Sequence, residues 1–153
     1  MSGLGPFDIE QAIDRLRERV PLLRTIGGAA DYVSAYERPG ATPSAFVILA
    51  GESISTTPLS GNVLKQRTEA DIDVAVAVRN YSASSRGKAQ IDGVRQVVAQ
   101  VRAALNGWKP VIDSADVIES MRGSGRARVL RYDADTLWWA DRFSVVYHGR
   151  ITT

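Results

Sequence analysis

Two aspartates, Asp71 and Asp73, are the residues of this sequence whose type and spacing best suit chemistry. They stand two positions apart in a segment where apolar residues alternate with polar ones, so a β-strand would place both on one face. Carboxylates are the ligands that hard divalent cations prefer, and a pair on one strand face can hold two magnesium ions. The pair therefore indicates a candidate site for a metal-dependent enzyme.

The residues upstream of the two aspartates do not complete such a site. The Asp-x-Asp motif is similar to the metal-binding strand of nucleotidyltransferases, which also need a Gly-Ser turn upstream to bind phosphate. The nearest candidate turn, Gly61-Asn62, lacks the serine and lies too close to the strand. We favour the interpretation that Glu69, Asp71 and Asp73 form the solvated face of an amphipathic strand. A nucleotidyltransferase-like enzyme is the alternative function.

Other catalytic signatures are missing from the sequence. His148 is the only histidine and there is no cysteine, whereas hydrolase triads and transition-metal sites usually need histidines beside suitable partners. Gly27-Gly28 lacks a Gly-x-Gly pattern, and the turn from Arg122 to Gly125 leads into a predicted strand instead of a helix, so neither matches a phosphate-binding loop. We therefore predict a protein that is not an enzyme, with no cofactor and no catalytic or metal-binding residue.

Four arginines crowd one predicted hairpin: Arg122, Arg126, Arg128 and Arg131. Such a cluster can contact phosphates, so a small nucleic-acid-binding module is a further alternative. However, no aromatic residue lies between the arginines at the tip to stack on a base, and the net charge of the chain is only +2. We favour a protein interface, or ion pairs with Glu119, Asp133 or Asp135.

The aspartates belong to the longest strand that the sequence predicts, residues 64–80. From Asp71 onward, apolar β-branched residues alternate with acids, alanines and an arginine, which is the pattern of a strand with one buried face. At about 3.3 Å per residue such a strand spans roughly 40–50 Å, well beyond the usual five or six residues. Its polar first half suggests a β-arm that reaches beyond the core and takes part in an assembly.

The rest of the chain divides into helices and shorter strands. Residues 9–20 and 90–106 carry apolar side chains at helical spacing, the first helix with Asp8 as its expected N-cap and Gln11 as the capping-box partner. Residues 45–50 form a continuous apolar run typical of a buried strand. In the last third, short connections favour an antiparallel meander of three strands: 117–121, 126–133 and 137–147. We predict an α+β fold, a mostly antiparallel sheet of about 4–5 strands with two main helices packed on one face.

Two features remain outside this predicted core. The segment 51–62 (GESISTTPLSGN) is polar, so we predict a long mobile loop or a hairpin tip before the long strand. Trp138 and Trp139 are consecutive in the last strand and therefore point to opposite faces. Trp139 shares its parity with the apolar residues of that strand and is the better core candidate. Trp138 is either an exposed interface anchor or covered by a helix.

Composition limits the class of protein. With 153 residues, of which 44% are hydrophobic and 24% charged, the chain is expected to form a single domain over residues 1–153 with a modest core. It contains no run of about 18 apolar residues and no signal-peptide pattern, so we expect no membrane partner. The lack of cysteine excludes disulfides and thiolate metal sites.

Four stretches spread over nearly the whole chain resemble the tail terminator (tail completion) proteins of long-tailed phages and prophages. They are PFDIEQAIDRLRERVPLLRTIGGAADY, ATPSAFVILA, LNGWKP and LRYDADTLWWADRFSVVY. The most specific pieces are a helix exit and an aromatic strand after an acidic turn: Leu105-x-Gly107-Trp108-x-Pro110 and Leu137-Trp138-Trp139 followed by Phe143. None of these pieces is a catalytic signature.

The resemblance implies a ring, commonly a hexamer, that caps the head-proximal end of the tail tube. Such a ring stops tube polymerisation and then joins the tail to the head connector, without chemistry or a cofactor. The implied partners are other copies of the chain, the tail tube protein, the head–tail connector protein, the sheath protein if the tail is contractile, and DNA in the lumen. The implied location is the virion tail, with the host cytoplasm as the place of assembly.

A long two-faced strand and an arginine-rich surface suit repeated head-to-tail contacts in a closed ring, which would also bury exposed strand edges. The interface candidates are charged residues of the long strand and the hairpin, together with one tryptophan: Lys65, Arg67, Glu69, Arg122, Arg126, Arg128 and Trp138. The segment 51–62 has no counterpart in the family pattern, and we expect it to contact the tube or the connector.

Overall fold

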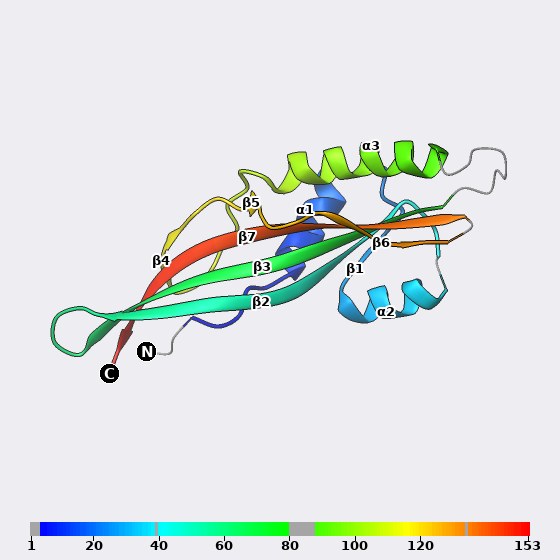
Figure 1. The fold of residues 1–153 in the computed structure, drawn as a ribbon. Helices are drawn as coiled ribbons and strands as arrows, with labels where there is room; N and C mark the ends of the chain where they lie inside the picture. The colour runs from blue at the N-terminus through cyan, green and yellow to red at the C-terminus, as the bar shows by residue number, and fades with distance from the viewer. Residues whose placement is uncertain (1–3, 39, 80–87, 134) are drawn as a thin grey trace.

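The computed structural model describes residues 4–38, 40–79, 88–133 and 135–153. Its helices and strands are, in chain order, α1 (Glu10–Arg19), β1 (Thr25–Gly27), α2 (Ala29–Glu37), β2 (Ser44–Pro58), β3 (Val63–Arg79), α3 (Lys88–Leu105), β4 (Ala115–Ile118), β5 (Arg122–Gly123), β6 (Arg128–Tyr132) and β7 (Thr136–Thr152). Figure 1 shows a long twisted sheet with α1 and α3 on one side and α2 on the other. None of these helices is long and apolar enough to cross a membrane.

Seven strands form one sheet in the described chain, ordered β1-β2-β3-β7-β4, with β5 and β6 also paired to β7. β1 pairs with β2 in parallel, and the other pairings are antiparallel. The prediction of about 4–5 strands with two main helices on one face is therefore wrong, because the sheet is mixed and a third helix covers its other face. β1 and β5 have three and two residues, too few to show an alternating pattern in the sequence.

The last third of the chain also differs from the predicted meander. β4, β5 and β6 do not follow one another across the sheet; each pairs with a different part of β7. β7 can accept all of them along one edge because it is 17 residues long. Short strands with turns between them therefore pair along this edge of β7.

The main core lies between the sheet and the helices α1 and α3. On β3, the alternating residues Ile72, Val74 and Val76 are each at most 1% exposed on this side, which confirms the predicted two-faced strand. α3 packs against them with the apolar stripe that the sequence predicts, except that Ile91 at its start is 48% exposed. Burying one such aliphatic side chain contributes about 1.5–3 kcal/mol, so this layer fixes which face of β3 is inside.

A smaller aromatic core on the opposite face explains the position of α2. Phe46 and Trp138 are at most 1% exposed there and are covered by Tyr32 and Tyr36 of the helix. The ring of Trp138 lies 5.7 Å from that of Tyr32 and 5.1 Å from that of Tyr36, both in edge-to-face arrangements. Of the two alternatives for Trp138, the fold provides the covering helix, so this side chain is not at the surface of the subunit.

β2, β3 and the end of β7 extend past the helices as a three-stranded arm, at the left of Figure 1. The segment 51–62 is mostly strand, because β2 continues to Pro58 and only residues 59–62 form the turn into β3. Gly61 has a φ of +66° in this turn, a conformation that glycine adopts without strain. The arm reaches beyond the core as the sequence suggested, while the mobility of residues 51–62 stays a prediction.

A charged face of the sheet as the candidate interface

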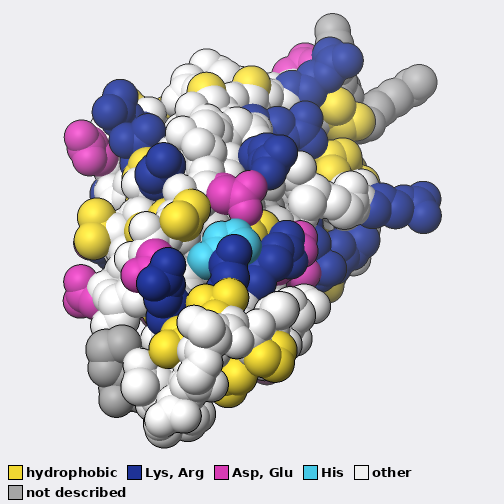
Figure 2. Space-filling view, turned by 90° about the vertical axis from the view of Figure 1, so that its left-hand side faces the viewer, with side chains coloured by type: hydrophobic (Ala, Val, Ile, Leu, Met, Phe, Trp, Pro, Cys, Tyr) yellow, Lys and Arg dark blue, Asp and Glu magenta, His cyan; other side chains and the backbone are white. Residues whose placement is uncertain are grey.

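Near the arm, one face of the sheet has no helix over it in the described part of the chain (Figure 1). α2 covers this face only at its other end, around Trp138. Because side chains alternate along a strand, the odd-numbered residues of β3 and the even-numbered residues of β7 point to this side. We call the uncovered part the charged face; its ionisable members on these strands are Lys65, Arg67, Glu69, Asp71, Asp73, Arg142, His148 and Arg150. Figure 2 shows acidic and basic side chains interleaved around the histidine at this end of the molecule.

The two aspartates of the candidate metal site are bonded to the neighbouring strand. Asp73 lies opposite Arg142, whose guanidinium donates to both carboxylate oxygens, at 2.8 and 3.2 Å. This hydrogen bonding is the main cause that raises the pKa of Arg142. Asp71 lies opposite Ser144 and accepts a hydrogen bond from its hydroxyl. Within the described ranges, no three His, Asp or Glu side chains come together as a metal site would need.

Three predicted interface residues, Arg67, Glu69 and Arg122, line one polar cavity of about 300 Å³. Arg67 Nη1 lies 3.5 Å from Glu69 Oε2, and Arg122 Nη2 lies 3.5 Å from Glu119 Oε1. The four side chains are at least 40% exposed, so solvent screens both pairs and each contributes under about 1 kcal/mol. Such pairs can exchange partners at little cost when another protein binds.

His148 lies in the middle of the charged face. Its Nε2 is 3.5 Å from Glu119 Oε2, and its Nδ1 is buried without a hydrogen-bond partner among the described residues. Nearer the arm tip, Arg150 Nε lies 3.4 Å from Asp116 Oδ2, and Lys65 stands opposite Arg150 in the β3–β7 register. The face therefore carries charges of both signs along its length, which suits a protein partner better than a uniformly negative phosphate backbone.

The predicted arginine hairpin is divided by the fold. Arg126, just before β6, and Arg128, its first residue, are exposed and do not line the polar cavity, unlike Arg122. Arg131 Nε donates to Asp133 Oδ2 at 2.7 Å, and this bond is the main cause that raises the pKa of Arg131. The ion pairs of Arg131 with Asp133 and of Arg122 with Glu119 are among those that the sequence suggested.

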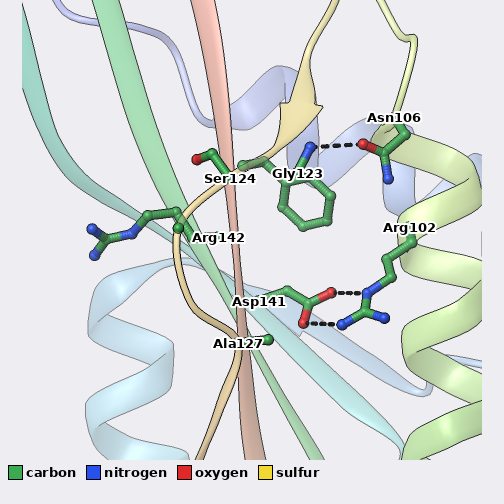
Figure 3. Close-up of a pocket in the computed structure, with 9 residues that line it drawn as sticks. Arg102, Asn106, Gly123, Ser124, Ala127, Asp141 and Arg142 are labelled. Carbon is green, nitrogen blue, oxygen red and sulfur yellow. Dashed lines mark hydrogen bonds and ion pairs between the residues drawn. The ribbon is translucent and has the colours of Figure 1, made fainter.

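Sequence reasoning missed an ion pair between Arg102 of α3, which is half exposed, and Asp141 of β7, which is buried. Asp141 is 5% exposed and accepts two hydrogen bonds from Arg102, at 2.6 and 2.9 Å, and one from Trp139 Nε1 at 2.8 Å. Figure 3 shows the guanidinium of Arg102 facing this carboxylate beside a cavity of about 170 Å³, with Arg142 directed away from it. The sequence held a signal for this pair. Asp141 has the same parity as Phe143 in β7, so both side chains point to the core side of the strand, where a carboxylate needs a hydrogen-bonding partner.

The aspartates of the charged face are held by bonds within the sheet. Their carboxylates are engaged by neighbouring guanidinium and hydroxyl groups, as the bonds of Asp73 and Asp71 show. Lys65, Arg67, Glu69 and Arg122 lie on or beside the charged face, Arg126 and Arg128 do not line its polar cavity, and Trp138 is buried. Which of these residues touch a partner stays a prediction.

Comparison with known proteins gives a family for nearly the whole chain. A family model described as phage tail terminator protein matches residues 2–153. Among solved structures, the chain is similar to one from the "Virion of native gene transfer agent (GTA) particle", with a TM-score of 0.59 and 16% identity over 92% of this chain and 93% of that chain. At this identity the likeness shows a shared fold. No curated protein matches the sequence.

Proposed function

Because the chain belongs to the phage tail terminator family, whose model matches residues 2–153, we propose that it forms a ring that caps the head-proximal end of a tail tube. The protein is a structural component of the virion tail, and its family is a structural one, not a family of enzymes. In the proposed role the ring stops polymerisation of the tube protein and then joins the tail to the head connector. The family match over nearly the whole chain is the observation that carries the proposal.

The composition of the arm supports a contact with the tube or the connector. No residue from Ser53 to Asn62 is charged, and Ile54 and Leu59 are 58% and 45% exposed. Exposed aliphatic side chains on a projecting element are typical of a surface that another protein covers. A ring of subunits that all point their arms one way would present these side chains to the adjoining structure.

An open strand edge supports a ring of identical subunits. β1 pairs with β2 only from Ser44 to Phe46, so the outer edge of β2 beyond that point has no strand beside it in the described chain. From Ser53 to Thr57 this edge carries neither a charge nor a proline, the usual devices that prevent pairing with another chain. A closed ring can bury such edges between neighbours, and we propose six copies.

The charges of both signs on the charged face support neighbours that are proteins. The proposed partners are other copies of the chain, the tail tube protein, the head–tail connector protein and, in a contractile tail, the sheath protein. If this face lined the channel, DNA in the lumen would meet acidic as well as basic side chains. We therefore expect only weak contact between DNA and this face.

Growth of tubes from the purified tube protein tests the proposed function by electron microscopy. Addition of this protein should stop elongation, and the tubes should stay at the length reached when it was added. The double variant Ile54→Ser/Leu59→Ser should stop growth less well. Its matched control is Val33→Ser, which removes a 59% exposed aliphatic group from α2 instead. Elongation that continues unchanged with the natural protein would overturn the proposal.

A further inference from the structure

Val111 is the most exposed large hydrophobic residue in the described chain, at 72%. Its backbone is nevertheless fixed by one side chain of α1. The Val111 N–H donates to Gln11 Oε1 at 2.9 Å, and Gln11 Nε2 donates to the Val111 carbonyl at 2.6 Å. Because both the N–H and the carbonyl of Val111 are bonded, the Val111 side chain is held in one position, which lowers the entropy cost of binding a partner. Val111 therefore has the features of a preformed contact residue.

The residues that follow Val111 add carboxylates to this contact surface. Asp113 and Asp116 are exposed, and Val117 is 54% exposed. Ser114 has a φ of +67°, a left-handed conformation that residues other than glycine adopt rarely. We call residues 111–117 the acidic loop. It combines apolar and acidic side chains, and so fits a surface with an apolar floor and basic residues beside it.

The same chain carries such a surface between α3 and the strands β6 and β7. The surface is a groove of about 470 Å³, and we call it the apolar groove; the lining residues that matter here are Ile91, Val129, Leu137, Trp139, Arg95 and Arg102. No acidic residue is among those that line it. Ile91 and Val129 are 48% and 53% exposed, although Ile91 belongs to the apolar stripe of α3 and Val129 lies opposite Trp139 on the side of the sheet that carries the main core. Arg102 is paired with Asp141, whereas Arg95 has no ion pair or hydrogen bond within the described residues.

The acidic loop cannot fill the apolar groove of its own chain. Ala115 pairs with Gly149 of β7 and Val129 pairs with Trp139, so the two sites lie about 33 Å apart along this strand. In Figure 1 the start of α3 and strand β4 accordingly lie toward opposite ends of the sheet. An acidic loop that occupies the groove must therefore come from another copy of the chain.

We infer that the acidic loop of one copy docks into the apolar groove of the next, with Val111 in the groove and Asp113 near Arg95. The complementary charges would orient the two copies, and the exposed aliphatic side chains on both surfaces would be removed from water. Because the two surfaces differ, the contact is head-to-tail, the type that closes into a ring when the rotation between copies allows it. This inference rests on the proposed ring and names one of its contacts.

Paired cysteines test the contact directly, because the natural chain has none. Under oxidation, Val111→Cys/Val129→Cys should give covalent multimers, since the two sulfurs are too far apart to join within one chain. The control Val111→Cys/Val33→Cys places the second cysteine on α2, at a valine of similar exposure on the other face, and should lose the multimers. The inference would be overturned if both double variants gave multimers alike or if neither did. It would also be overturned if the disulfides joined only the cysteines at position 111 of two copies.

Sedimentation equilibrium measures the strength of the same contact. Val111→Ser should weaken self-association by roughly tenfold or more, and Val33→Ser should leave it unchanged. Arg95→Glu and Asp113→Arg should each weaken it, and their combination should restore it because the charges are exchanged. Unchanged self-association in Val111→Ser, or cross-links from Val111 to the tube protein alone, would overturn the inference. If variants that lose this contact still cap tubes, the contact is wrong and the proposed function stands. If the natural chain forms these multimers but does not cap tubes, the proposed function is wrong and the contact stands.

Discussion

Replacement of Arg102 with alanine tests the ion pair that joins α3 to β7 beside the main core. Asp141 is 5% exposed and has three hydrogen-bond donors, two of them on Arg102. The substitution leaves a buried carboxylate with Trp139 as its remaining donor. Removal of one partner of a buried ion pair usually costs about 3–5 kcal/mol, because the other charge stays desolvated.

The expected cost here lies below that range, because the Arg102 side chain is 49% exposed and water can enter the space it leaves. We expect Arg102→Ala to lower the free energy of unfolding by about 2–3 kcal/mol, or to lower Tm by roughly 4–12 °C. Urea denaturation followed by circular dichroism measures this change, at a protein concentration where the chain is monomeric so that self-association adds nothing.

Arg17→Ala is the matched control for this experiment. It also removes an arginine from a helix, but the pair of Arg17 with Asp14 has 58% and 72% exposed side chains, so its loss should cost under about 0.5 kcal/mol. In the Arg102→Ala background, Asp141→Asn should cost little further, because the charge that lost its partner is gone. Equal costs for Arg102→Ala and Arg17→Ala would refute the reasoning about the buried carboxylate.

Three further predictions concern residues on both faces of the sheet. Burial, and secondly the hydrogen bond to Glu52, raises the pKa of Tyr147 in the folded protein. The neutral phenol therefore contributes its full stability below the unfolded pKa of about 10, and this stability is lost as the pH rises above that value. In urea titrations at alkaline pH, Tyr147→Phe should make the fall in stability with pH less steep. Trp138→Ala should cost about 3–5 kcal/mol of stability because the indole is buried; a loss of self-association with unchanged stability would make Trp138 an interface residue instead. Asp71→Asn and Asp73→Asn should leave Mg²⁺ affinity, measured by titration calorimetry, as it is in the natural chain; loss of a binding site would restore the enzyme alternative.

The elements with regular apolar spacing were predictable from the sequence. The alternation around Ile72 and Val76 predicted β3 and its buried face, and the helical stripes predicted α1 and α3. The continuation of β2 through residues 51–58 was not predictable in this way, because nearly all side chains of β2 are exposed there and the sequence has no apolar alternation. The expected Asp8 cap is confirmed in part: the Asp8 carboxylate accepts a hydrogen bond from the Glu10 N–H at 3.0 Å, but the Gln11 side chain bonds to the backbone of Val111 across the molecule instead of completing a capping box.

The candidate site depended on information that local sequence does not contain. The pairing of Asp73 with Arg142 and of Asp71 with Ser144 follows from the register of two strands that are some 70 residues apart in the chain. The burial of Trp138 depends on α2, whose residues show no strong apolar stripe and are not fully buried. The partner of Asp141 was missed although local sequence held a signal for it, because a carboxylate in the core parity of β7 needs a hydrogen-bonding partner.

Cryo-electron microscopy of tail tubes assembled with this protein tests the central claim most directly. We expect density for the chain at one end of each tube only, as a closed ring of identical subunits with their arms against the neighbouring structure. Subunits distributed along the tube wall, or tubes whose ends both lack the protein, would contradict it.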